Sequence, residues 1–278
     1  MVRRREIDVW DILRNTMKRQ FILHVGTHKT GSKSLQRFML DHAGDISRKG
    51  VAVYRGEFRD ANHIELHLAA MRDERDSFAR LVRTDLTIDA GFRRHVADRV
   101  QAFIRSRCEE RLVFTAEGLC WLRHDDEIDR LQTILGVGNG EAKVVLYLRN
   151  KVDFLRSYTA QIHKVPGRQP SNDRSSTLYV EPDSWLVDYD ALVATYQRGF
   201  GAGNVVVIDY DQEMRTVGNV IPSFLKVLGL DAAEELDFSS YFLNTTDPAE
   251  QRKPPRGAKR WIEQAKRAWL PWKRGRAA

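Results

Sequence analysis

Cysteine is scarce in this chain, with only Cys108 and Cys120 among 278 residues. Two cysteines are too few for a disulfide-stapled scaffold or a cysteine-rich zinc site, which favours a reducing compartment. No stretch reaches the ~18 consecutive apolar residues of a membrane-spanning helix. The basic first residues also lack the apolar core of a signal peptide, and no internal repeat is visible. The sequence therefore predicts a cytoplasmic location.

The charge balance is strongly basic. Lys and Arg outnumber Asp and Glu by 45 to 38, the formal net charge is +7, and hydrophobic residues make up 42% of the chain. Such a chain can bury a full core, and its positive charge attracts nucleotides, acidic glycans, nucleic acids or anionic lipid surfaces. Charge alone does not choose among these partners.

Short apolar runs alternate with segments of helical spacing along the first 250 residues. The runs that we expect to be strands are residues 21–25, 51–54, 111–115, 143–148 and 204–210. Strands alternating with helices predict an α/β domain with a doubly wound, mainly parallel sheet of about five strands and flanking helices. We assign residues 1–250 to this single domain and residues 251–278 to a basic, tryptophan-containing extension.

The stretch 21–36 combines a strand, a turn-prone loop and a helix start. A helix that begins directly after a loop points unpaired N–H groups and its positive dipole end at one spot, which favours a phosphate or sulfate. Gly26 and Gly31 fit the nucleoside-triphosphate loop G-x-x-x-x-G-K-[ST], but Ser32 stands where lysine is required. A kinase or ATPase would have to use Lys33 and Ser34, one residue late. An ordinary basic loop is the remaining alternative.

Without any shift, residues 29–35 (KTGSKSL) resemble the K-[TS]-G-[TS]-[TS]-x-[LW] loop of sulfotransferases that use 3′-phosphoadenosine 5′-phosphosulfate (PAPS). The wider string HVGTHKTGSKSLQ resembles bacterial carbohydrate-type members. The resemblance implies that Lys29 stabilises the leaving oxygen. It also implies a nucleotide-binding loop made of Lys29, Thr30, Gly31, Ser32, Lys33 and Ser34. Lys33 departs from the family pattern, where Thr or Ser is usual, and we expect its charge to replace the hydroxyl contact.

A second part of the resemblance lies at the strand 143–148. In the family, an arginine at a strand end and a serine eight residues later bind the 3′-phosphate that distinguishes PAPS from ATP, and Arg149 and Ser157 have this spacing. A planar guanidinium suits bidentate phosphate contact. We therefore expect Arg149 and Ser157 to complete the nucleotide site.

Glu117 follows the strand 111–115, at the sheet edge where α/β proteins bind ligands. The family resemblance implies that Glu117 takes the proton of the acceptor, and helix capping or salt bridging is the alternative. His28, beside Lys29, is a second candidate base. His63 and His67 have the i, i+4 spacing of a metal pair, but no third ligand is evident, so we interpret them as a solvated helix face.

The sequence thus predicts a PAPS-dependent sulfotransferase that releases adenosine 3′,5′-bisphosphate and needs no metal. The expected acceptor is a glycan or glycolipid, and a small alcohol, phenol or amine is the alternative. The alternatives are a P-loop kinase using ATP and Mg²⁺ and a basic nucleic-acid-binding protein, although no nucleic-acid motif is recognised. Near the end of the chain, Arg252, Lys253 and Arg256 are candidate anion contacts, and residues 259–276 fit either a peripheral membrane helix or a docked surface helix.

Overall fold

The computed structural model describes residues 19–230, 236–238, 240 and 241. Its centre is a five-stranded sheet with the order β2-β3-β1-β4-β5, in which every neighbouring pair is parallel. The strands are β1 (Gln20–Gly26), β2 (Val51–Val53), β3 (Arg111–Thr115), β4 (Ala142–Leu148) and β5 (Val205–Asp209). The predicted fold class and the five predicted strands are therefore confirmed.

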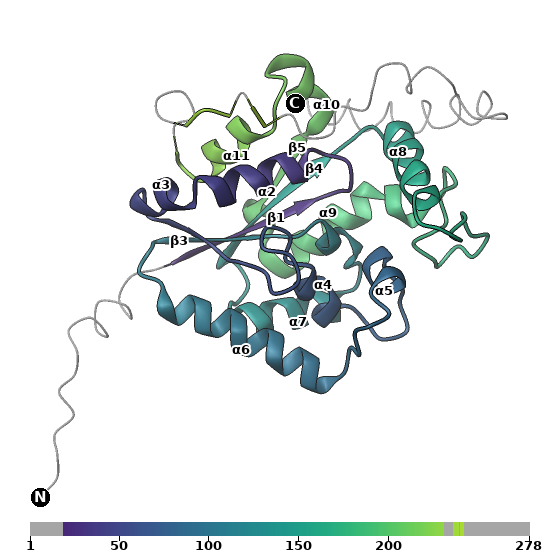
Figure 1. Ribbon diagram of the computed structural model, residues 1–278, viewed down its shortest axis with the longest axis horizontal. Coiled ribbons are helices and arrows are strands. Elements are labelled where there is room, and N and C mark those ends of the chain that lie inside the picture. The colour runs from purple at the N-terminus through teal and green to yellow at the C-terminus, as the bar shows by residue number, and fades with distance from the viewer. Residues whose placement is uncertain (1–18, 231–235, 239, 242–278) are drawn as a thin grey trace, which may run out of the picture.

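Helices cover both faces of the sheet, which lies edge-on between them in Figure 1. One layer contains α2 (Ser32–Asp41), α3 (Ala43–Arg48), α10 (Tyr210–Thr216) and α11 (Ile221–Val227). The opposite layer contains α4 (Ile64–Ala70), α5 (Phe78–Val82), α6 (Ala90–Ser106), α7 (Asp125–Leu135), α8 (Lys151–His163) and α9 (Tyr189–Phe200). Successive side chains of β1 point to opposite faces of the sheet. Ile22 packs against the layer that contains α2, and Leu23 and Val25 pack against the layer that contains α4. This double burial explains why the central strands are continuous apolar runs.

Two stretches of helical spacing are divided into shorter elements in the structure. The amphipathic segment from Trp185 is broken into a 3₁₀ turn, Trp185–Val187, and α9. Ser184 caps the turn, and Asp188 caps α9 by accepting the N–H of Ala191, so each piece has its own start signal. The helical stretch between residues 61 and 107 likewise forms three separate helices, α4, α5 and α6.

The interpretation of His63 and His67 as a solvated helix face is wrong, because both side chains are buried. His63 Nδ1 accepts the N–H of Thr115 at 2.9 Å, and any side chain at Gly118 would overlap the His67 ring. Burial lowers the pKa of both histidines to about 3, so they are neutral packing residues. Within the described residues no cluster of three or more metal-ligating side chains occurs.

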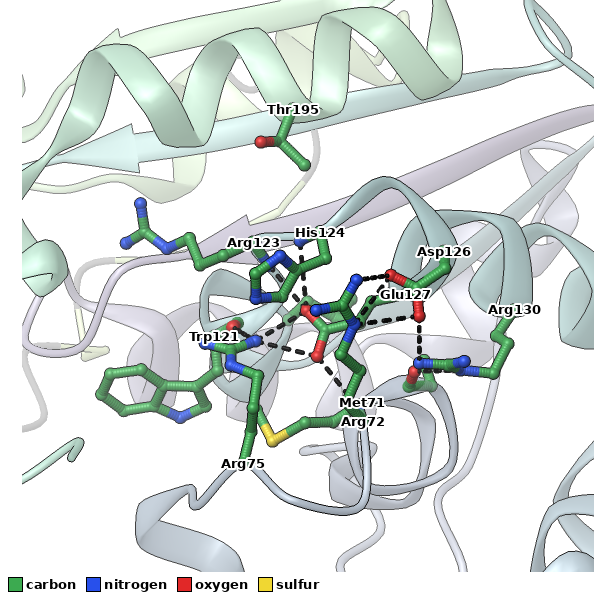
Figure 2. Close-up of polar contacts among 12 residues, drawn as sticks. Met71, Arg72, Arg75, Trp121, Arg123, His124, Asp126, Glu127, Arg130 and Thr195 are labelled. Atoms are coloured by element: carbon green, nitrogen blue, oxygen red, sulfur yellow. Dashed lines mark hydrogen bonds and ion pairs between the residues drawn. The ribbon is translucent and has the colours of Figure 1, made fainter. Parts of the chain in front are cut away.

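A buried ion pair holds the start of α7 in place (Figure 2). The fully buried Glu127 carboxylate accepts Arg75 Nη1 at 2.6 Å and the backbone N–H groups of Arg72 and Arg123 at 2.9 and 2.8 Å. Arg75 also donates to the carbonyl of Trp121 at 2.9 Å, which ties the segment after β3 to the same carboxylate. This Glu127 latch positions the 3₁₀ turn that follows β3, Glu117–Trp121.

None of the described helices is long and apolar enough to cross a membrane. The extension at 251–278, with Arg252, Lys253, Arg256 and the tryptophan-containing segment, lies outside the described residues. The predictions for that part of the chain stay predictions.

Candidate functional site

Three strand ends bring the predicted site residues together. β1 lies between β3 and β4, with His24 paired to Thr115 on one side and Gly26 to Tyr147 on the other. The loop after β1 is therefore flanked by Glu117 after β3 and by Arg149 after β4. Because the chain order reverses between β1 and β4, this edge is the topological switch point at which open α/β sheets bind ligands.

The loop after β1 is held by hydrogen bonds from its own threonines. Thr27 donates to the Tyr147 carbonyl through its N–H at 3.3 Å and its hydroxyl at 2.9 Å, and the Thr30 hydroxyl donates to the Thr27 carbonyl at 2.6 Å. Lys29 adopts a left-handed conformation with φ 70°, the one positive φ outside glycine among residues that the structure describes. An L-residue pays a steric cost there, and such strain gathers at functional sites.

The loop ends in an uncapped helix terminus. Gly31, with φ 76°, is the N-cap of α2 and offers no side-chain cap to the first N–H groups of the helix. The Ser32 hydroxyl is buried and has no hydrogen-bond partner within the described residues. An anion placed at this terminus would satisfy both the N–H groups and the hydroxyl.

Positive charge converges on the loop. Burial lowers the pKa of Lys29, and the nearby charges of Lys164, Lys33 and Arg149 lower it further, against the opposing effect of Glu117. Lys33 itself is exposed in the first turn of α2. Cations crowded in this way repel one another, and a polyanionic ligand would relieve the repulsion.

The structure brings Arg149 and Ser157 into contact. Arg149 Nη1 donates to Ser157 Oγ at 3.1 Å and to the Lys29 carbonyl at 3.2 Å, so the strand-end arginine touches both α8 and the loop. The guanidinium carbon lies 5.5 Å from the ring centroid of Tyr210, while Arg149 Nε is buried without a partner in the described chain. Asn150 caps α8, which fixes the helix turn that carries Ser157.

Glu117 forms an ion pair with His28. Its Oε2 lies 3.0 Å from His28 Nδ1, and the two side chains are 16% and 15% exposed. Burial alone would raise the pKa of Glu117, but the hydrogen bond from His28 and nearby positive charge, including that of Lys33, hold that pKa below its ordinary value. Glu117 is therefore an ionised carboxylate at neutral pH, and the salt-bridge alternative is observed with His28 as the partner.

Aromatic rings fix His28. The ring centroids of Trp121 and Tyr158 lie 4.7 and 5.6 Å from that of His28. His28 Nε2 is buried and has no hydrogen-bond partner in the part of the chain that is described. Because Glu117 keeps some exposure and His28 Nε2 has none, the carboxylate is the group that an incoming molecule can reach.

The crystal structure of a sulfotransferase from Alicyclobacillus acidocaldarius superposes with a TM-score of 0.50 and 17% identity, covering 78% of this chain and 84% of that one. The fold is that of a sulfotransferase. A mouse sulfotransferase, SULT7A1, complexed with PAP, gives a TM-score of 0.38 and 12% identity over 81% of this chain and 64% of that one. No family model and no curated protein sequence matches the chain.

Several residues around this candidate site were not predicted from the sequence. Tyr210, whose ring centroid lies 5.5 Å from the Arg149 guanidinium carbon, directly follows β5, whereas the predicted strand 204–210 included it, so it was not recognised as a strand-end residue. Asp211 accepts the N–H of Asn150 at 2.6 Å and thereby supports the Arg149 turn. Lys164 at the end of α8 carried no signal in the sequence, because its approach to Lys29 depends on the direction of the helix.

Proposed function

We propose that this protein is a PAPS-dependent sulfotransferase that moves a sulfuryl group to a hydroxyl or amine of an acceptor. The observation that carries the proposal is the contact of Arg149 with both Ser157 and the Lys29 carbonyl. It joins two anion sites, the uncapped start of α2 and the arginine–serine pair, at one sheet edge. Such a double site suits a nucleotide with phosphates at both the 5′ and 3′ positions. The unpartnered Ser32 Oγ and Arg149 Nε fit such a ligand.

The residues have distinct roles in this proposal. As the acceptor oxygen bonds to sulfur, the bond from sulfur to the 5′-phosphate oxygen breaks, and adenosine 3′,5′-bisphosphate leaves with the electron pair. Lys29 neutralises the charge that develops on the leaving oxygen. The α2 terminus, with Thr30, Gly31, Ser32, Lys33 and Ser34, holds the 5′-phosphate, and Arg149 with Ser157 holds the 3′-phosphate.

Glu117 is the base in this proposal, and His28 positions it. An ionised carboxylate that keeps some exposure can accept the acceptor proton as the new bond forms. The His28 hydrogen bond fixes the carboxylate and leaves the other carboxylate oxygen to face the acceptor. We further propose a glycan or glycolipid as the acceptor, in line with the bacterial carbohydrate-type motif and the basic charge of the chain.

Ligand binding tests the proposal. Adenosine 3′,5′-bisphosphate should raise the melting temperature without Mg²⁺, with a stabilisation of about 2.7 kcal/mol at a hundredfold excess over Kd. ATP with Mg²⁺ should stabilise much less, whereas a kinase would show the reverse order. Equal stabilisation by both nucleotides, or by neither, would contradict the proposal. A nucleic-acid-binding protein would instead show steeply salt-dependent affinity for DNA or RNA.

A pair of arginine variants locates the 3′-phosphate site. Arg149→Ala should remove the preference for adenosine 3′,5′-bisphosphate over adenosine 5′-monophosphate. Arg156→Ala is the matched control, because Arg156 lies next to Ser157 on α8 and, among the described residues, forms an ion pair only with Asp153 at 3.3 Å. If Arg156→Ala lost the preference and Arg149→Ala kept it, the assignment would be wrong.

A further inference from the structure

A buried histidine lies beneath the phosphate loop, and the proposed reaction does not use it. His24, in β1, is 0% exposed, and neither of its ring nitrogens has a hydrogen-bond partner within the described chain. The rings of Tyr147 and Phe224 meet it edge-on, each with its centroid 5.6 Å away. Leaving a buried polar group unsatisfied costs about 1–3 kcal/mol, so the position calls for an explanation.

The location of His24 connects it to Ser32. His24 and Gly26 lie on the same face of β1, since alternate strand residues share a face. A Cβ built on Gly26 would lie 2.9 Å from His24 Nε2 and 2.6 Å from Ser32 Oγ. The ring nitrogen and the hydroxyl therefore approach the same spot over Gly26, and both lack partners.

We propose that His24 is a positioning residue of the phosphate loop, donating from Nε2–H to Ser32 Oγ when the 5′-phosphate of the nucleotide occupies the loop. A serine hydroxyl accepts one hydrogen bond and donates another, so a donor behind it turns its O–H outward to the anion. Burial lowers the pKa of His24 to about 4, and the ring is neutral at physiological pH. Gly26 keeps the space between the two groups open. The inference rests on the function proposed above.

A double-mutant cycle tests the coupling. His24→Phe keeps a ring against Tyr147 and Phe224 but removes both nitrogens, and it should weaken adenosine 3′,5′-bisphosphate binding about 3- to 10-fold, as for one neutral hydrogen bond. Ser32→Ala should cost at least as much. The double variant should bind no more weakly than Ser32→Ala alone, because the histidine acts only through the hydroxyl. Phe224→Leu, which disturbs the packing of His24 without touching its nitrogens, should bind as the wild-type chain does.

Spectroscopy of the wild-type chain gives a readout that does not depend on a variant folding. The ¹⁵N shifts of His24 should report a neutral ring protonated at Nε2, and adenosine 3′,5′-bisphosphate should move the Nε2 signal while the ring stays neutral. Unchanged affinity in His24→Phe, additive losses in the double variant, or a ring protonated at Nδ1 would overturn the proposal. If the wild-type chain does not bind the nucleotide at all, the proposed function fails instead.

Discussion

Three fully buried histidines make the fold sensitive to mild acid. Burial lowers the pKa of His24 from 6.5 to about 4 and that of His63 and His67 from 6.5 to about 3. The unfolded chain therefore binds protons at a higher pH than the native chain does. The stability that these residues contribute is present above pH 6.5, and it is lost as the pH falls from 6.5 toward 4 for His24 and toward 3 for His63 and His67.

The expected loss is large. Around pH 5 each histidine is protonated in the unfolded chain and neutral in the native one, so each contributes a slope of about 1.4 kcal/mol per pH unit. Together the three give about 4 kcal/mol per pH unit. Between pH 7 and pH 5 the free energy of unfolding should fall by about 6 kcal/mol, which is a large share of the 5–15 kcal/mol of a typical domain.

Urea unfolding followed by tryptophan fluorescence at pH 7, 6 and 5 measures this slope. His24→Phe should reduce the proton uptake on unfolding by about one. A wild-type slope of less than one proton between pH 6 and pH 5 would refute the assignment of these histidines as buried and neutral.

Three further substitutions probe the loop and its support. Gly26→Ala should abolish nucleotide binding in a calorimetric titration, because the new Cβ would lie 2.6 Å from Ser32 Oγ. Lys29→Gly should raise the free energy of urea unfolding by about 1 kcal/mol by relieving the left-handed lysine, yet weaken binding by removing its charge. Glu127→Gln should lower stability by about 3–5 kcal/mol, visible as a fall in melting temperature, because Arg75, whose side chain is only 15% exposed, loses its counter-charge.

The strands and the outline of the site were predictable from the sequence. β3 was predicted at its observed bounds because a parallel strand buried on both faces is a continuous apolar run. Glu117 was selected as a candidate because it lies just after such a run, at the edge where parallel strands end, and Arg149 because its position and its spacing from Ser157 resemble the sulfotransferase pattern. Arg149 can contact Ser157 only if a helix begins between them. The sequence indicates such a helix, and α8 begins directly after its N-cap, Asn150.

Burial and loop conformation were not predictable in the same way. The spacing of His63 and His67 shows that they share a side of a helix, but not that Thr115 and Gly118 cover that side. Thr115 and Gly118 lie about fifty residues from these histidines in the sequence. The pairing of β3 with β2 in the folded chain brings them close. The left-handed backbone conformation of Lys29 also could not be predicted from the sequence, since lysine has no preference for positive φ.

The strained lysine is held by partners from both sides of the loop. Thr27 anchors one end of the loop to β4, Gly31 starts α2 at the other, and Arg149 donates to the Lys29 carbonyl between them at 3.2 Å. These contacts over-determine the backbone, which is the condition for strain to persist. In the proposed reaction the nucleotide lies over β1 and β4, and the acceptor meets Glu117 beyond β3. Lys29 lies in the loop after β1, the strand between β3 and β4. In this proposal its charge therefore stays close to the sulfuryl group as the group moves from the nucleotide to the acceptor.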